Sequence, residues 1–255
     1  MVDGKVRIYS QYSSYINMYE YKPTYWEEGN VYDVELEAPT FESMTLFAQV
    51  EQIMKKNGNI YFLGYLQTVN GKTPCVWEKN KLISYSDPTK NSSTSASDFY
   101  ITDNDDVVIF RTYENCYYEP LDKTFDNIAA TFKNGELLKL YCNEESMTRY
   151  NNYYHTWCGR IIKVDNDIYL SIVETPSDVD KNNLIIYKND VEMFRINTST
   201  LLHMCVKDGV VYTCHSYSNP HEYIISFNEN EKVTKAIVGK NNFSLIIKGM
   251  IVLPE

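Results

Sequence analysis

The sequence predicts an all-β fold, a five-bladed β-propeller, from a repeated motif, from the turns within each repeat and from the residue types. An aromatic residue followed by a polar turn recurs at intervals of roughly 40–55 residues, the length of one four-stranded blade. The motif is found at Trp26, Trp77, Phe132, Tyr187 and Phe227. The composition agrees, because 14% of the residues are aromatic and Tyr, Val, Ile and Thr suit a pleated sheet.

A second landmark precedes each aromatic anchor, a turn rich in Asp, Asn and Gly that leads into a short apolar run. Such turns between apolar runs predict β-hairpins, because both central residues of a type I′ turn need positive φ. The five turns are Asp3-Gly4, Asn57-Gly58, Asp105-Asp106, Asn166-Asp167 and Asp208-Gly209.

The second repeat shows the expected blade most fully. Four short strands are predicted at about 47–54, 59–66, 73–78 and 82–86, joined by polar turns. The link over 87–97 is rich in Ser, Thr and Asn, so we expect it to cross to the next blade without forming a core element. Four strands followed by a crossover describe one propeller blade.

The repeats together predict a single domain whose first and last segments share a blade. The first repeat begins at its hairpin turn and lacks a first strand, which we expect residues 243–247 to supply, closing the ring. A six-bladed or incomplete ring and another β architecture are the alternatives. Residues 122–130 are expected to form a short helical or irregular insert. The predicted blades are 1–46 plus 243–255, 47–97, 98–156, 157–200 and 201–242.

Two motifs of the second repeat resemble a known style of repeat. Gly-Asn-Ile-Tyr-x-x-Gly-Tyr over 58–65 and Val-Trp-Glu-Lys-Asn-Lys over 76–81 are similar to repeats of uncharacterised Bacteroides-type surface or secreted propeller proteins. The resemblance covers all five repeats and is weakest in the third. It implies a propeller, often exported as a lipoprotein, and it implies no defined chemistry.

Charge and hydropathy exclude some classes of partner. The net charge of −10 argues against nucleic acid, which needs clustered Lys and Arg. No apolar stretch approaches the roughly 20 residues that span a bilayer, and the start, 1–4, carries no export signal. An extracellular, cell-surface or periplasmic location is expected if the chain is a processed or truncated piece of a longer precursor.

The sequence predicts no metal site and no cofactor. Six cysteines show no CxxC spacing and are expected to be buried free thiols, with a disulfide between Cys205 and Cys214 as the alternative. Four histidines form no HExxH motif. The Asp-rich segments 103–106 and 165–167 offer oxygen ligands for Ca²⁺, but they coincide with hairpin turns, which need Asp and Asn for backbone reasons.

Candidate ligand-binding residues follow from the position where the first strands of the blades are expected to converge. We count back nine or ten residues from the central residue of each second strand. The positions reached are Glu51 (or its neighbour Gln52), Tyr100, Arg160 and His203, with Ser244 on the closing strand. One hypothesis is a small polar or anionic ligand held by Arg160 and His203. The alternative is a hydrated channel in which these polar groups satisfy one another.

Aromatic clusters provide a second kind of candidate. Tyr117 and Tyr118 are adjacent, and Tyr153 and Tyr154 lie close to Trp157. Exposed rings offer flat surfaces to sugars or proteins, so Tyr118 and Trp157 join the candidates. The alternative is that these rings pack between blades.

The function predicted is a non-catalytic binding module that recognises a glycan or a protein at one face, with no catalytic residue assigned. The alternative is a glycoside hydrolase at the propeller axis, which needs two carboxylates facing one sugar. Glu51 and Asp98 are the acidic residues expected on or near inner strands. A third hypothesis is a structural segment of a larger assembly that binds no ligand.

Overall fold

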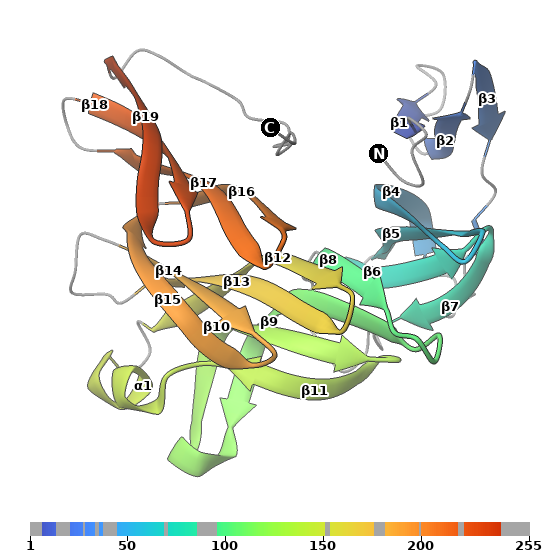
Figure 1. Cartoon of the computed structure of the whole chain (residues 1–255). Coiled ribbons are helices and arrows are strands. Elements are labelled where there is room, and N and C mark those ends of the chain that lie inside the picture. Colours follow the sequence, from blue (N-terminus) through green and yellow to red (C-terminus); the bar gives the residue numbers. More distant parts are fainter. Residues whose placement is uncertain are drawn as a thin grey trace. The chain divides into compact units, whose positions relative to one another are not determined.

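A computed structural model of the chain shows an all-β architecture built from antiparallel sheets (Figure 1). Two compact units are distinguished, Met1–Asn115 with Ala130–Lys139, and Cys116–Ala129 with Leu140–Glu255. No helix within the described residues is long and apolar enough to cross a bilayer. The structure describes residues 7–13, 21–27, 29–33, 36–37, 45–68, 71–85, 96–150, 154–175, 182–198, 200–218 and 222–240.

The first sheet has three strands, as the sequence predicts for a repeat that lacks its first strand. Strands β1 (Arg7–Ser13), β2 (Tyr21–Glu27) and β3 (Asn30–Asp33) pair in the order β1-β2-β3. The segment 243–247, expected to complete this sheet, and the turn at Asp3-Gly4 lie outside the described residues.

The second sheet confirms the strands predicted for the second repeat. It contains four strands in sequence order, so every neighbour is joined by a hairpin. Both faces of the sheet are covered by apolar side chains. The strands are β4 (Thr45–Lys56), β5 (Asn59–Thr68), β6 (Gly71–Glu78) and β7 (Lys81–Tyr85).

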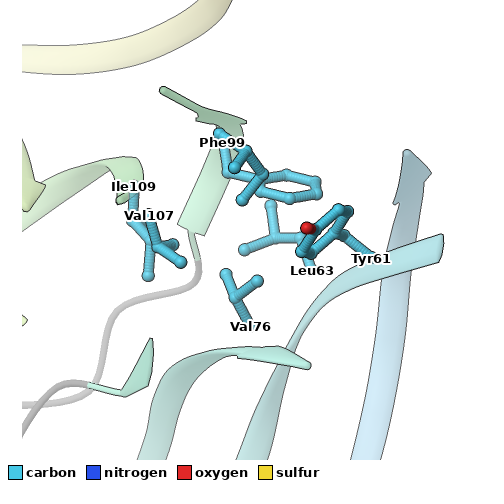
Figure 2. Close-up of a cluster of buried hydrophobic side chains, with 7 residues drawn as sticks. Tyr61, Leu63, Val76, Phe99, Val107 and Ile109 are labelled. Carbon is cyan, nitrogen blue, oxygen red and sulfur yellow. The ribbon is translucent and has the colours of Figure 1, made fainter. Parts of the chain in front are cut away.

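Alternation along β5 explains how the second sheet is buried on both sides. Tyr61 and Leu63 point to one face, where they pack with Phe99 of the third sheet (Figure 2). Phe62 points to the other face and packs with Trp77. The Trp77 indole also donates a hydrogen bond to the Glu37 carbonyl at 2.8 Å. The aromatic anchor of this repeat is therefore a core residue.

The third sheet corrects one prediction. Residues 123–133, expected in part to be helical or irregular, form a strand that buries Phe125 and Ile128. Only a 3₁₀ turn, Glu119–Leu121, and Asp122 at a φ of 49° interrupt the hairpin. The sheet is ordered β11-β10-β9-β8. Its strands are β8 (Ala96–Ile101), β9 (Val107–Tyr118), β10 (Lys123–Lys133) and β11 (Glu136–Tyr141).

A short helix, α1 (Glu144–Tyr150), was not predicted from the sequence. Its first hydrogen bond runs from the Met147 amide to the Asn143 carbonyl at 2.8 Å, which makes Asn143 the N-cap. Glu144 and Glu145 lie in the first turn, where acidic residues complement the helix dipole. Met147 is fully buried, so tertiary packing holds this seven-residue helix in place.

The last two sheets belong to the second unit and share a hydrophobic cluster. Tyr169, Leu184 and Ile186 of one sheet pack with Met204 and Val211 of the next. Strands β12 (His155–Val164), β13 (Asp167–Thr175), β14 (Asn182–Lys188) and β15 (Val191–Thr198) form the fourth sheet. Strands β16 (Thr200–Lys207), β17 (Val210–Ser218), β18 (Glu222–Glu229) and β19 (Lys232–Lys240) form the fifth.

Two hairpin turns are confirmed by their backbone angles. Asn57-Gly58 and Asp208-Gly209 have φ values of 50° and 82° and of 51° and 77°, the positive pair that a type I′ turn requires. In the fourth sheet the positive φ falls on Asp165, one residue before the predicted Asn166-Asp167 turn. Asp167 instead begins β13, where its carboxylate accepts a hydrogen bond from Asn189 at 2.8 Å.

In the four four-stranded sheets, the turn that follows the aromatic anchor is tied to the second strand of the same sheet. Asn134, Asn189 and Asn230 have φ values of 50°, 48° and 49°, in the left-handed region. Each backbone amide donates to a carbonyl of the second strand, and each side-chain Oδ1 accepts from the amide of that same residue. The partners are Val107 (2.9 and 2.9 Å), Ile168 (2.8 and 2.8 Å) and Val211 (2.7 and 3.1 Å). We call this pair of hydrogen bonds the asparagine clamp.

The second sheet has only half of the asparagine clamp. Lys79 occupies the clamp position at a φ of 55°, and its amide donates to the Ile60 carbonyl at 2.7 Å. A lysine side chain has no acceptor to offer the Ile60 amide. Lysine is also less tolerant than asparagine of the left-handed conformation.

We therefore expect Lys79→Asn to raise the free energy of unfolding by about 1 kcal/mol, through the added hydrogen bond and the relieved backbone strain. Urea denaturation followed by tryptophan fluorescence measures the change. Asn189→Gly is the matched control, because it keeps the left-handed backbone but removes the side-chain bonds, and it should destabilise the chain. A Lys79→Asn variant no more stable than the parent would contradict this role for the clamp.

Candidate functional site

The first strand of each four-stranded sheet contains a β-bulge, and the predicted ligand residues lie at or near these bulges. The register shifts fall between Val50 and Gln52, Ala96 and Asp98, Cys158 and Ile161, and Leu201 and His203. All four strands are edge strands of their sheets. A bulge bends an edge strand and changes where its side chains point, so these positions suit ligand contact.

Glu51 is the extra residue of the β4 bulge, in the first unit. Burial raises the pKa of its carboxyl, and the positive charge of Lys72 partly opposes the shift. The Lys72 ammonium lies 4.1 Å from the centre of the Tyr65 ring, and the Tyr65 hydroxyl donates a hydrogen bond to the Gln49 side chain. Glu51 therefore lies among polar side chains of β4, β5 and β6, including that of Lys72.

The backbone opposite the β4 bulge requires a glycine. Gly64 pairs with Val50, immediately beside the register shift. A Cβ atom at Gly64 would lie 1.7 Å from the Gln49 carbonyl oxygen and 2.9 Å from the Val50 Cα. Because both are backbone atoms, a side chain here is incompatible with the bulged strand.

Tyr100 and Tyr118 are weaker candidates for ligand binding, since Tyr100 is buried and the structure does not describe the Tyr118 side chain. Tyr100 lies on β8 and is only 7% exposed, within the core of the first unit. Tyr118 ends β9, and its side chain lies outside the described part of the structure. Its neighbour Tyr117 is 57% exposed and donates a hydrogen bond to Asp122 at 2.7 Å.

The second unit holds Arg160 in the bulge of β12. The Arg160 amide donates to the Ser171 hydroxyl at 2.8 Å, and that hydroxyl donates to the Arg160 carbonyl at 3.4 Å. A Cβ atom on the preceding Gly159 would lie 2.5 Å from Ser171 Oγ and 2.7 Å from Leu201 Cδ2. Gly159 thus lets β12 approach β16 closely, and Ser171 satisfies the backbone that the bulge removes from the ladder.

Arg160 and His203 lie on neighbouring strands, β12 and β16, and the charge of Arg160 contributes to the pKa of His203. Burial lowers the pKa of His203, a hydrogen bond from its Nδ1 to the Met204 carbonyl at 3.0 Å opposes that shift, and the charge of Arg160 lowers the pKa further. β12 and β16 are edge strands of the fourth and fifth sheets and lie next to each other. We call this region the β12–β16 edge.

Trp157 adds an exposed aromatic surface to the β12–β16 edge. It lies three residues before Arg160 on β12 and is 44% exposed. The His155 ring lies 6.4 Å from the Trp157 ring, with 36° between their planes. Tyr154, a member of the same predicted aromatic cluster, is instead buried and donates a hydrogen bond to the buried Glu174 at 2.8 Å. Only Trp157 of this cluster is shown to be open to solvent.

His215 was not identified from the sequence as a candidate. It pairs with Leu201 next to the β16 bulge and is 5% exposed. Its Nδ1 makes no hydrogen bond to the described part of the chain. The signal that was available is the alternation Val211, Thr213, His215, which places a titratable group where a core residue is expected.

The Asp-rich turns use their carboxylates within the fold. Asp106 lies 2.7 Å from Lys133, and Asp167 lies 2.8 Å from Lys188. Hydrogen bonds from Lys133 and Asn134 lower the pKa of Asp106. Among the residues that the structure describes, no group of three or more His, Cys, Asp or Glu side chains is arranged to hold a metal ion.

The cysteines that the structure describes are free thiols, including Cys205 and Cys214. Cys214 pairs across the hairpin with His203 and Cys205 with Tyr212, so the two cysteines are not directly opposite each other. Burial raises the pKa of Cys214 to about 11. Cys75 and Cys214 are buried, as expected of small apolar residues.

Comparisons with known proteins give distant likenesses. No protein-family model and no curated protein matches the sequence. A polysaccharide lyase, Uly1, is similar over 93% of this chain and 56% of its own, with a TM-score of 0.48 and 9% identity. The Bombyx mori GH32 β-fructofuranosidase BmSUC1 gives a TM-score of 0.38, 11% identity and coverages of 76% and 49%.

A bifunctional GH43-CE protein of Bacteroides eggerthii is similar over 87% of this chain and 31% of its own, with a TM-score of 0.37 and 12% identity. This chain spans about half the length of the first two structures. At TM-scores below 0.5 these likenesses carry no argument about fold or chemistry. The predicted resemblance to Bacteroides-type repeat propellers likewise gains no support from a family model.

We expect Arg160→Met to raise the pKa of His203, because the variant removes the neighbouring positive charge. A titration of the imidazole C–H signals by NMR measures the shift. Lys163→Met, on the same strand, is the control and should leave the pKa of His203 where it was. An unchanged pKa in Arg160→Met would show that the two side chains do not interact.

Proposed function

We propose that this chain is a carbohydrate-recognising β-propeller whose ligand binds at the β12–β16 edge. The observation that carries the proposal is an exposed indole, Trp157, on the same strand as Arg160 and three residues from it, with His203 on the neighbouring strand β16. An aromatic face binds the apolar face of a sugar ring, and flanking polar groups fix its orientation. In the same proposal the five sheets are blades of one ring closed by residues 243–247, which experimental coordinates for that segment would test.

The composition of the β12–β16 edge favours binding over cleavage. An arginine stays protonated under ordinary conditions and serves as a rigid hydrogen-bond donor. Glycoside hydrolysis needs a pair of carboxylates on either side of the scissile bond, and Arg160 and His203 supply neither. The non-catalytic function predicted from the sequence therefore remains the main proposal for this edge.

The test is the affinity of Trp157→Ala for oligosaccharides that bind the parent chain. We expect binding to weaken by at least tenfold, because the variant removes the stacking surface. Isothermal titration calorimetry measures it, after a glycan array has identified ligands. Tyr32→Ala is the control, since Tyr32 is 42% exposed on a different sheet and should be replaceable without effect. Unchanged affinity in Trp157→Ala would refute the assignment of the site.

Glycoside cleavage is a second candidate because two carboxylates lie at bulges of the first unit. Glu51 is in the bulge of β4, and Asp98 directly follows that of β8 and is 4% exposed. Burial raises the pKa of Glu51, as a general acid requires. In this candidate Glu51 protonates the leaving oxygen, and Asp98 acts as the nucleophile or base.

If cleavage occurs, Glu51→Gln should reduce sugar release by at least a hundredfold while the chain still binds the same glycan. A reducing-end assay measures release. Glu78→Gln, on β6 of the same sheet, is the control for a lost negative charge and should retain activity. No release by the parent chain from any glycan that it binds would eliminate this candidate and leave the binding proposal intact.

A further inference from the structure

We infer that the β12–β16 edge selects sugars that carry an anionic group, a uronate carboxylate or a sulfate ester. This inference rests on the proposed carbohydrate function and names its ligand class. The chain as a whole has a net charge of −10, which repels anions. The edge combines Arg160 with a titratable imidazole, the opposite of that overall balance.

The backbone fixes where the cation lies. Both backbone polar groups of Arg160 are bonded to the Ser171 hydroxyl, and Gly159 allows β12 to contact Leu201 of β16. The Arg160 side chain therefore starts from a strand position whose backbone is hydrogen-bonded, and not from a loop. A guanidinium with a fixed base offers a planar pair of donors that matches a carboxylate or a sulfate.

His203 gives the edge a charge that depends on the ligand. Alternation places Cys205, Tyr212 and Cys214 on its face of the hairpin, and β12 contributes Arg160. Burial raises the pKa of both thiols, so they stay neutral near pH 7. Arg160 is thus the charged group that disfavours protonation of His203. An anion between the two would reverse that effect and draw a proton onto the imidazole.

His215 lies on the opposite face of the β16–β17 hairpin from His203 and is not part of this site. It is 5% exposed, pairs with Leu201, and its Nδ1 makes no hydrogen bond to the described part of the chain. Alternation along β17 puts His215 on the face of Val211, which packs against the fourth sheet.

The test compares two matched pairs of probes by calorimetry. Hexagalacturonate is compared with its carboxyl-reduced form, and a sulfated carrageenan oligosaccharide with its desulfated form. We expect the anionic member of at least one pair to bind tenfold or more tightly than its neutral partner. The pair that shows the preference identifies the source of the charge. Lowering the pH from about 7.5 to about 5.5 should widen the preference, because His203 gains its proton.

Variants assign the preference to this edge. The ratio of anionic to neutral affinity should fall towards one in Arg160→Met and narrow in His203→Gln, whereas Arg160→Lys should keep part of it as a point charge. Trp157→Ala should weaken both members of a pair. Circular dichroism confirms that each variant folds.

Two outcomes separate the inference from the function on which it rests. Equal affinity for both members of both pairs would overturn the anion preference while leaving carbohydrate recognition in place. Failure of every probe, together with no glycan found on the array, would overturn both. A preference that survives in Arg160→Met would place the anion site elsewhere and refute the inference.

Discussion

The structure of each sheet depends on the left-handed backbone at its hairpin turns. In the asparagine clamp, one residue supplies both the turn and two hydrogen bonds to a strand that is not its sequence neighbour. The clamp therefore fixes the second hairpin of a sheet against the first. A clamp asparagine follows the anchor in the third, fourth and fifth sheets, and the anchors Trp77 and Phe132 are buried in the core. Trp, Phe and Tyr interchange at the anchor, since packing tolerates different rings.

Bulged edge strands do two things in this fold. A bulge disrupts the regular ladder that an exposed edge would offer to another chain. It also sets Glu51 and Arg160 apart from the alternation of their strands. The carbohydrate proposal and the anion preference both build on the second effect, because Arg160 starts from a bulge of β12, next to the strand that carries His203.

The sequence predicted the features that depend on local sterics and missed those that depend on a partner strand. Asn57-Gly58 and Asp208-Gly209 were predictable, because few residues accept positive φ. The hypothesis that Arg160 and His203 share a site came from the repeat offset and stays a prediction. The bulge at Gly159 could not be foreseen, because it depends on Ser171 and Leu201, which are distant in sequence.

Two secondary-structure errors have a similar origin. The polar residues at the start of β10 break the alternation that marks a strand, yet Phe125 and Ile128 are drawn into the core. Helix α1 is too short for a periodic signal and is held by burial of Met147. His215 is not predicted as a candidate residue, because its burial distinguishes it and burial leaves no motif in the sequence.

Gly64 distinguishes the second sheet from the other four-stranded sheets, because its first hairpin depends on a glycine at this position. Where it lies, every other amino acid would drive a methyl group into the main chain of the adjoining strand. The fourth sheet has its glycine on the opposite strand of the pair, Gly159, where a Cβ atom would meet the side chains of Ser171 and Leu201. The second sheet could not be replaced by a copy of the fourth without remodelling of the hairpin formed by its first two strands. The two sheets therefore keep a similar repeat length in the sequence but differ in the residues that let their first two strands approach each other.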